Sequence, residues 1–153
     1  MEKPHYPIIM NPENNGFSYE FDSISEHKTI RKVVVYVPYP EDENIYQLAF
    51  GNLLEGNRID VLDKSANHDM EMILATVIRT LLDFLELYPD KSVIFTGSTG
   101  SRTRLYRATI SKMFDSLQDV LSVYGVTYDL DREPFDKNKD YYAFLISLKN
   151  GKN

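Results

Sequence analysis

An apolar stripe between residues 70 and 85 limits the possible folds of this chain more than any other feature. Its members recur every three or four residues, which predicts a helix with one wide apolar face that must lie against a sheet. Asn67 or Asp69 can cap this helix, Glu71 suits its first turn, and Pro89 marks its end. The stripe consists of Met70, Ile73, Leu74, Val77, Ile78, Leu81, Leu82 and Leu85.

Strand patterns precede this helix. Phe17, Tyr19 and Phe21 alternate with polar residues, as in a strand with one buried face. A nearly continuous apolar run follows and predicts a central strand, which Pro38 and Pro40 should end because neither can donate a ladder hydrogen bond. Short connections between the strands favour an antiparallel meander of three to four strands. We expect these strands at residues 17–22, Ile30–Val37, Ile45–Phe50 and Ile59–Leu62.

The second half predicts the order α-β-α-β-β. A short strand at Val93–Thr96 leads into a second helix from about Ser101 to Tyr124, where Gly125 is placed as a left-handed C-cap. Two strands should follow, at Thr127–Leu130 and Tyr141–Leu148, joined by the charged connection Asp131–Asp140. The whole pattern indicates an α+β fold with a mainly antiparallel sheet and both long helices packed on one face. We expect an irregular N-terminal arm at 1–16 and a single domain at 17–150.

Composition restricts the class of protein. The 153 residues are 42% hydrophobic and 26% charged, as in a globular domain. The absence of cysteine excludes disulfides and thiolate zinc sites, and suits a reducing compartment. We see no signal-peptide pattern and no stretch of membrane-spanning length. The sequence therefore predicts a soluble, cytoplasmic protein with no membrane partner and no cofactor.

Charge is unevenly distributed along the chain. The formal net charge of −6 argues against broad non-specific binding to nucleic acids. Residues 91–114 nevertheless contain five basic residues and no acid, which leaves 12 basic and 23 acidic residues elsewhere. One basic segment thus lies inside an acidic protein.

This basic segment contains the candidate functional site. A strand that leads through a small-residue turn into a helix start directs unpaired backbone N–H groups, and the positive end of the helix dipole, at one point. Glycines permit close approach of a ligand, hydroxyls offer hydrogen bonds, and guanidinium groups bind phosphate well. The candidate ligand-binding residues are Gly97, Ser98, Thr99, Ser101, Arg102, Thr103, Arg104 and Arg107. Alternatively, Ser101 caps the helix and the arginines pair with carboxylates of the chain.

Established motifs do not fit this turn. It lacks the spacing and the lysine of a P-loop, and Thr99 occupies the nucleophile position of a G-x-S-x-G elbow. Metal sites around His68, Asp69 and Glu71, or from several loop carboxylates, have no supporting spacing, so we predict no metal site. Those loop carboxylates are Asp60, Asp63, Asp129, Asp131 and Glu133. Aromatic residues of the strands could stack on bases, but core packing explains them better because basic residues are not interleaved.

The residues Gly97–Arg107, G-S-T-G-S-R-T-R-L-Y-R, resemble the signature of a family of uncharacterised bacterial proteins, in which a G-S-T-x-x-R-T-R-L-Y-R string recurs. The resemblance extends over about residues 17–149. It implies a small α+β domain of unknown function and supplies no established activity. It also implies that Ser98, Arg102, Thr103, Arg104 and Tyr106 matter together, without indicating their role, and it adds Tyr106 to the candidate site. Flanking similarities are Y-Q-L-A-F-G at 46–51, I-D at 59–60, L-A-T-V at 74–77, E-P-F at 133–135 and Y-Y-A-F-L at 141–145.

Two functions remain open. The first is a non-catalytic binding module that recognises a phosphate-bearing ligand, such as a nucleotide or RNA, or an acidic protein segment. The second is an enzyme acting on a phosphate ester or nucleotide, with the arginines stabilising charge and Asp60 or Asp129 acting as base or metal ligand. The sequence identifies no catalytic residue beyond these candidates, and a homo-oligomer is also possible.

Overall fold

The structure is a computed structural model that describes residues 4–11, 17–55, 58–60, 69–96 and 100–149. Residues 54, 58–60 and 100–106 are described by their backbone alone. The chain divides into two units. Unit 1 comprises Met1–Val37 and Ala49–Leu87, and unit 2 comprises Pro38–Leu48 and Tyr88–Asn153.

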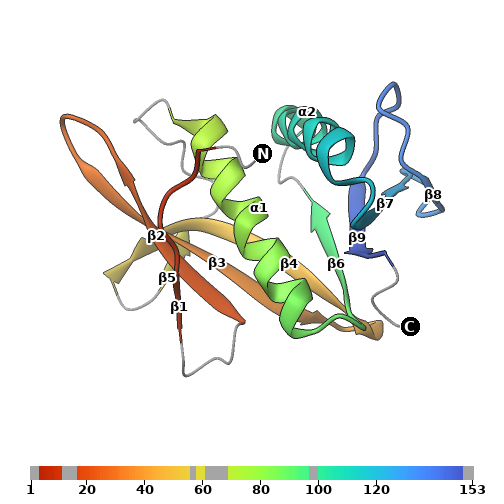
Figure 1. Ribbon diagram of the computed structural model, residues 1–153, viewed down its shortest axis with the longest axis horizontal. Helices are drawn as coiled ribbons and strands as arrows, with labels where there is room; N and C mark the ends of the chain where they lie inside the picture. Colours follow the sequence, from red (N-terminus) through yellow and green to blue (C-terminus); the bar gives the residue numbers. More distant parts are fainter. Residues whose placement is uncertain (1–3, 12–16, 56–57, 61–68, 97–99, 150–153) are drawn as a thin grey trace. The chain divides into compact units, whose positions relative to one another are not determined.

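Unit 1 contains β1, β2 and most of β3, which pair in that order as antiparallel neighbours, and the second half of β4, with which the short β5 pairs antiparallel (Figure 1). In the pairing of β2 with β3, Tyr19 lies opposite Val34 and Phe21 lies opposite Lys32. Alternate residues of β2 are buried, as the period-two pattern predicted. The bounds are β1 Ile9–Met10, β2 Ser18–Ile24, β3 Thr29–Tyr39, β4 Asp42–Leu54 and β5 Arg58–Asp60.

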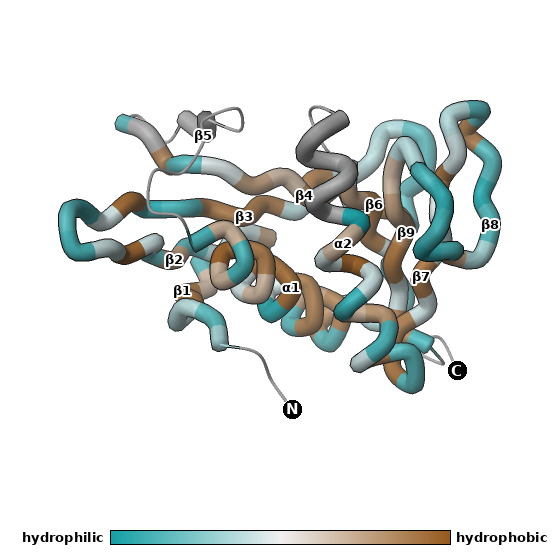
Figure 2. The backbone as a smooth tube through the Cα atoms, turned by 90° about the horizontal axis from the view of Figure 1, so that it is seen from above, coloured by the Kyte–Doolittle hydropathy of each residue, from teal (hydrophilic) through white to brown (hydrophobic). Residues whose placement is uncertain are grey.

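Helix α1, Met70–Leu87, packs on β3 within unit 1. Phe84 stacks on Tyr36 with ring centroids 4.3 Å apart and an interplanar angle of 8°. The Tyr36 hydroxyl lies 2.8 Å from Thr80 Oγ1, so this polar group is satisfied inside the core. Figure 2 shows hydrophobic residues along α1 and the middle of β3. The predicted stripe is buried in part: Ile73, Leu74, Val77, Leu81 and Leu85 are buried, whereas Met70, Ile78 and Leu82 are partly buried. Thr76, Thr80 and Phe84, which the prediction did not include, complete the buried face.

The N-terminal segment contacts α1. Tyr6 is buried, and its backbone N–H donates to Thr76 Oγ1 at 2.9 Å. Its hydroxyl donates to Asp69 Oδ2 at 2.5 Å, and the Ser23 hydroxyl donates to the same oxygen at 2.5 Å. Residues 4–11, within the predicted arm, are thus tied to the start of α1 and, through β1, to β2.

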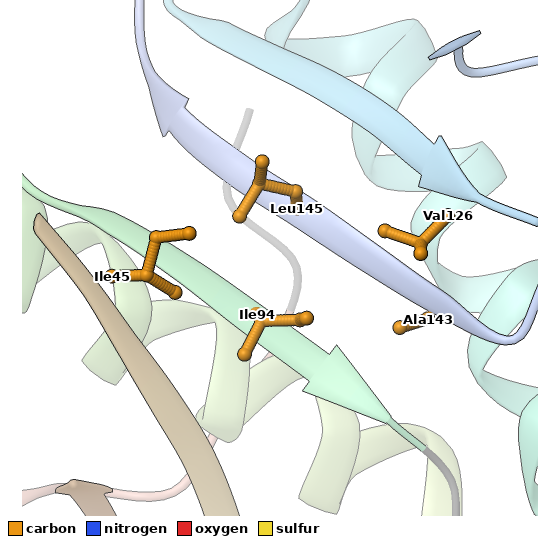
Figure 3. Close-up of a cluster of buried hydrophobic side chains, with 5 residues drawn as sticks. All are labelled: Ile45, Ile94, Val126, Ala143 and Leu145. Atoms are coloured by element: carbon orange, nitrogen blue, oxygen red, sulfur yellow. The ribbon is translucent and has the colours of Figure 1, made fainter. Parts of the chain in front are cut away.

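Unit 2 contains the first half of β4, residues 42–48, followed across the sheet by β6, β9, β7 and β8 in that order. Strand β6 runs parallel to β4 and antiparallel to β9. Figure 3 shows one apolar cluster that four of these strands build, from Ile45, Ile94, Val126, Ala143 and Leu145. The new bounds are β6 Ser92–Thr96, α2 Gly100–Leu117, β7 Leu121–Val126, β8 Arg132–Pro134 and β9 Ala143–Leu148.

Aromatic residues fill the other face of β9, because side chains alternate along a strand. Phe144 contacts Phe135 with ring centroids 6.0 Å apart, and Phe135 contacts Phe114 of α2 at 5.8 Å. Tyr141 packs against the same ring at 5.9 Å. Helix α2 is therefore attached to its strands through Phe135.

The second half of the predicted fold needs correction. Helix α2 ends at Leu117, and Leu121–Val126 is strand β7. Gly125 is not a helix cap: a Cβ there would lie 2.2 Å from the Tyr141 ring, so glycine permits close packing inside β7. The predicted strand Thr127–Leu130 forms a turn, closed by a hydrogen bond from Leu130 N to Thr127 O at 2.8 Å.

The sheet is also larger than the predicted meander. Strand β3 continues through Pro38 to Tyr39, and β4 is longer than expected. Strand β6 adds a parallel pairing, and β8 forms within the charged connection. Mixed helix and strand content, two helices and a mostly antiparallel sheet are confirmed for the described residues. The single domain at 17–150 and the packing of both helices on one face stay predictions.

No helix of the described ranges has the length and apolarity needed to cross a membrane.

Candidate anion-binding site

The candidate site follows β6, a strand of unit 2 with neighbours on both sides. Its residues Val93, Ile94 and Phe95 are buried, so its position is fixed by packing. Helix α2 begins at Gly100, so only three residues separate it from the end of the strand at Thr96. The first four backbone N–H groups of a helix have no acceptor within that helix. The start of α2 therefore supplies donors immediately after a fixed strand.

Most predicted ligand-binding residues belong to this connection. Gly97, Ser98 and Thr99 lie outside the described residues. The others fall in the first two turns of α2, and the first turn contains no acidic residue to complement the helix dipole. Arg104 and Arg107 are three residues apart, so they share a face of the helix. The remaining members, known here by their backbone, are Ser101, Arg102, Thr103, Arg104 and Tyr106.

Arg107 is the member of the predicted site whose side chain the structure describes. Its guanidinium donates to the backbone carbonyl of Lys139 at 3.0 Å and forms an ion pair with the Asp140 carboxylate. The side chain is 28% exposed. Arg107 thus joins α2 to the connection between β8 and β9, which is the kind of pairing that the alternative interpretation expected.

A second polar group orders the same connection. Lys139 Nζ donates to both carboxylate oxygens of Glu133, at 3.0 and 2.7 Å, and the Tyr141 hydroxyl donates to Glu133 at 2.8 Å. The hydrogen bond from Lys139, followed by that from Tyr141, lowers the pKa of Glu133. The hydrogen bond to Glu133 raises the pKa of Lys139. Glu133 therefore serves as an internal acceptor.

Within the part of the chain that the structure describes, the other carboxylates considered from sequence form no group that could hold a metal ion. No three His, Cys, Asp or Glu side chains of the described residues are grouped to hold a metal ion. Asp69 accepts hydrogen bonds from Tyr6 and Ser23 instead. His68 and Asp63 lie outside the described residues, as does the side chain of Asp60.

Sequence reasoning missed a buried polar group in unit 1. Lys32 is 4% exposed and donates to the side-chain carbonyl of Asn52, which is also buried. Lys32 interrupts the apolar alternation of β3 on the face that Tyr36 shares, and this interruption was the available signal. The strand aromatics Tyr19, Tyr36 and Tyr141 are buried, so core packing is the confirmed interpretation for them.

Comparison with known proteins identifies a family to which the chain is similar. A family model described as a family of unknown function, DUF6934, matches residues 2–149. This match begins further toward the N-terminus than the similarity expected from about residue 17, so it includes the segment around Tyr6. No curated protein and no solved structure matches the chain significantly. The chain belongs to the family of unknown function DUF6934.

Proposed function

We propose that this protein is a binding module whose connection from β6 to α2 recognises a phosphate or phosphate-bearing ligand. The observation that carries the proposal is the start of α2: a helix N-terminus with three arginines in its first eight residues and no acid in its first turn. It lies within an acidic chain whose remaining residues, taken together, carry 12 basic and 23 acidic side chains.

The physical reason is the positive charge that the helix dipole and the arginines place at this helix start. Arginine near a helix N-terminus opposes the helix dipole by about 0.3–1 kcal/mol. An anion that binds the free N–H groups removes this penalty and gains charge-assisted hydrogen bonds from the guanidinium groups. Glycine and hydroxyl residues at 97–101 suit such a ligand because they leave the backbone accessible.

The three arginines have different roles in this proposal. Arg107 is held by Asp140 and by the Lys139 carbonyl, so it fixes the helix relative to the β8–β9 connection within unit 2. Arg102 and Arg104 are closer to the helix start and bind the anion. A ligand with one terminal phosphate suits a site formed by two arginines and one helix terminus.

An amide-resolved NMR titration tests the proposal. Inorganic phosphate, a nucleotide and a short RNA are added separately at two salt concentrations. We expect saturable shifts confined to residues 97–107, weaker at the higher salt concentration. Arg102→Gln and Arg104→Gln should each remove most of the binding. Arg31→Gln is the matched control, because Arg31 pairs with Glu20 and Asp22 in unit 1.

Two results would change the conclusion. Absence of saturable shifts with every anion would reject the binding site and leave the arginines with internal partners. If phosphorus NMR shows that the nucleotide is turned over during the titration, this result would instead support the alternative that the protein is an enzyme. That activity should then depend on Arg102 and Arg104 but not on Arg31.

A further inference from the structure

A separate surface of unit 2 exposes large side chains in the connections that follow β7 and precede β9. Tyr128 is 65% exposed, Leu130 68% and Tyr142 47%. Asp129 and Asp131 alternate with the first two and are exposed as well. We call these five residues the tyrosine–leucine surface.

Hydrogen bonds hold this surface in one conformation. Thr127 N donates to Asp131 O at 2.8 Å, and Asp131 N donates to Thr127 Oγ1 at 3.1 Å, which closes the turn. Tyr142 N donates to Val126 O at 2.7 Å and so places Tyr142 beside the turn. The rings of Tyr128 and Tyr142 meet edge to face, with centroids 6.2 Å apart and an angle of 68°. The surface is therefore ordered before any partner binds.

Leu130 is a poor choice for the stability of this turn. Its φ is 66°, in the left-handed region that a Cβ disfavours and that glycine or asparagine adopts more easily. Its exposed side chain recovers little of this cost through burial. Strain of this kind at an exposed apolar residue is typical of functional positions. The backbone conformation of Leu130 therefore lowers the stability of the turn while the side chain stays exposed.

The charge around these side chains selects the kind of partner. The carboxylates of Asp129 and Asp131 form no hydrogen bond or ion pair with any residue that the structure describes. Two lysines of the connection between β8 and β9 have other partners: Lys139 pairs with Glu133, and Lys137 Nζ lies 4.0 Å from the Asp115 carboxylate. Arg132 adds one positive charge. Two carboxylates beside two tyrosine rings attract cations and repel nucleic acids and acidic lipids.

We propose that the tyrosine–leucine surface binds a basic segment of another protein. An arginine or lysine of that segment lies against the tyrosine rings and pairs with Asp129 or Asp131. An apolar side chain of the segment covers Leu130. The proposal does not rest on the anion site, because it concerns other residues and a ligand of the opposite charge.

The test is an amide-resolved NMR titration with a synthetic Arg-Leu-Arg-Leu-Arg-Leu peptide, and with Glu-Leu-Glu-Leu-Glu-Leu as the control peptide. We expect saturable shifts at residues 127–131 and 142 with the basic peptide only. Asp129→Asn combined with Asp131→Asn should weaken binding about tenfold. Glu41→Gln combined with Glu43→Gln is the matched control, because it removes the same charge from exposed positions of unit 2 and should leave binding unchanged.

Leu130→Asn separates binding from folding. Asparagine suits the left-handed backbone, so this variant should raise the melting temperature while it weakens peptide binding. The proposal is overturned if the peptide gives no saturable shifts, if the control variant weakens binding as much, or if Leu130→Asn binds as well as the wild type. It is also overturned if the same shifts appear when the protein alone is concentrated, because the occupant would then be a second copy.

Discussion

The N-termini of the two helices differ in the charge of the side chains that surround them. At the start of α1, Asp69 accepts hydrogen bonds from Tyr6 and Ser23, and Glu71 adds a second acid in the first turn. The first turn of α2 has no acid and contains Arg102, and Arg104 follows that turn directly. An N-terminal acid stabilises a helix, whereas a base there destabilises it.

This contrast separates a structural helix start from a candidate functional one. At the start of α1, the Tyr6 and Ser23 side chains, which are distant in sequence but belong to unit 1, donate hydrogen bonds to Asp69. Near the start of α2, the structure shows Arg107, in the second turn, in contact with Asp140 and the carbonyl of Lys139. The positive charge at the start of α2 is what an external anion would neutralise.

The largest expected effect is on the core under α1. Phe84 is fully buried and stacks on Tyr36, so Phe84→Ala should lower the free energy of unfolding by about 3–5 kcal/mol. Phe114→Ala is the matched change in α2, where the ring is only half-buried, and should cost less than half as much. Urea denaturation measures both. Equal losses would show that α2 is packed as firmly as α1.

The next effect concerns the start of α1. Asp69→Ala leaves the hydroxyls of Tyr6 and Ser23 without their shared acceptor, so unfolding should become easier by about 1–3 kcal/mol. Asp83→Ala in the same helix is the control. It breaks only a half-exposed pair with Arg79 and should cost no more than about 0.5 kcal/mol. Similar losses in the two variants would mean that the Asp69 hydrogen bonds do not anchor the helix.

A smaller effect, of opposite sign, is expected at the start of α2. Arg104→Glu replaces a base with an acid near the positive end of the dipole and should raise the free energy of unfolding by about 0.3–1 kcal/mol. It should also abolish phosphate binding. Arg107→Gln should lower stability by about 0.2–1 kcal/mol, because it removes the pair with Asp140. If Arg104→Glu instead destabilises the protein strongly, Arg104 is structural and the contrast between the two helix starts fails.

The sequence predicted those parts of the fold that depend on local patterns. Strand β2 alternates buried and exposed residues, and α1 repeats its apolar residues at helical spacing, so both were recognisable. Strand β7 was not, because Leu121 and Tyr124 continue the spacing of the preceding helix. Its pairing with β9 and the contact of Gly125 with Tyr141 decide its structure, and both depend on residues distant in sequence.

In the candidate site, too, the features set by local sequence could be predicted, and those set by distant residues could not. Composition indicated a basic helix start, and the structure places that start directly after β6. The partner of Arg107 could not be predicted, since Asp140 is one of many acids and lies 33 residues further along the chain. The tyrosine–leucine surface was also missed. Its signal was present, however: Tyr128 and Leu130 are large apolar residues in a segment otherwise rich in charge.

The smallest expected effect is on the pH dependence of stability, through Glu133 in the connection between β8 and β9 that contacts Arg107. The pKa of Glu133 is lowered from its ordinary value of 4.5, first by the Lys139 hydrogen bond and then by that from Tyr141. The unfolded chain therefore binds this proton more readily than the folded one. The interactions of ionised Glu133 therefore stabilise the fold fully at pH values above the pKa that Glu133 has in the unfolded chain. This stabilisation is lost as the pH falls through the lower pKa of the folded state.

Carbon NMR of the Glu133 carboxyl group measures this shift directly. We expect its midpoint below 4.5 in the wild type and closer to 4.5 in Lys139→Met, because that variant removes the larger cause. Lys137→Met, which leaves the pair intact, should not move it. An unchanged midpoint in Lys139→Met would mean that the Tyr141 hydroxyl alone holds Glu133. The order of the β8–β9 connection would then come from the aromatic core of unit 2, and the Arg107 contact would depend on packing more than on charge.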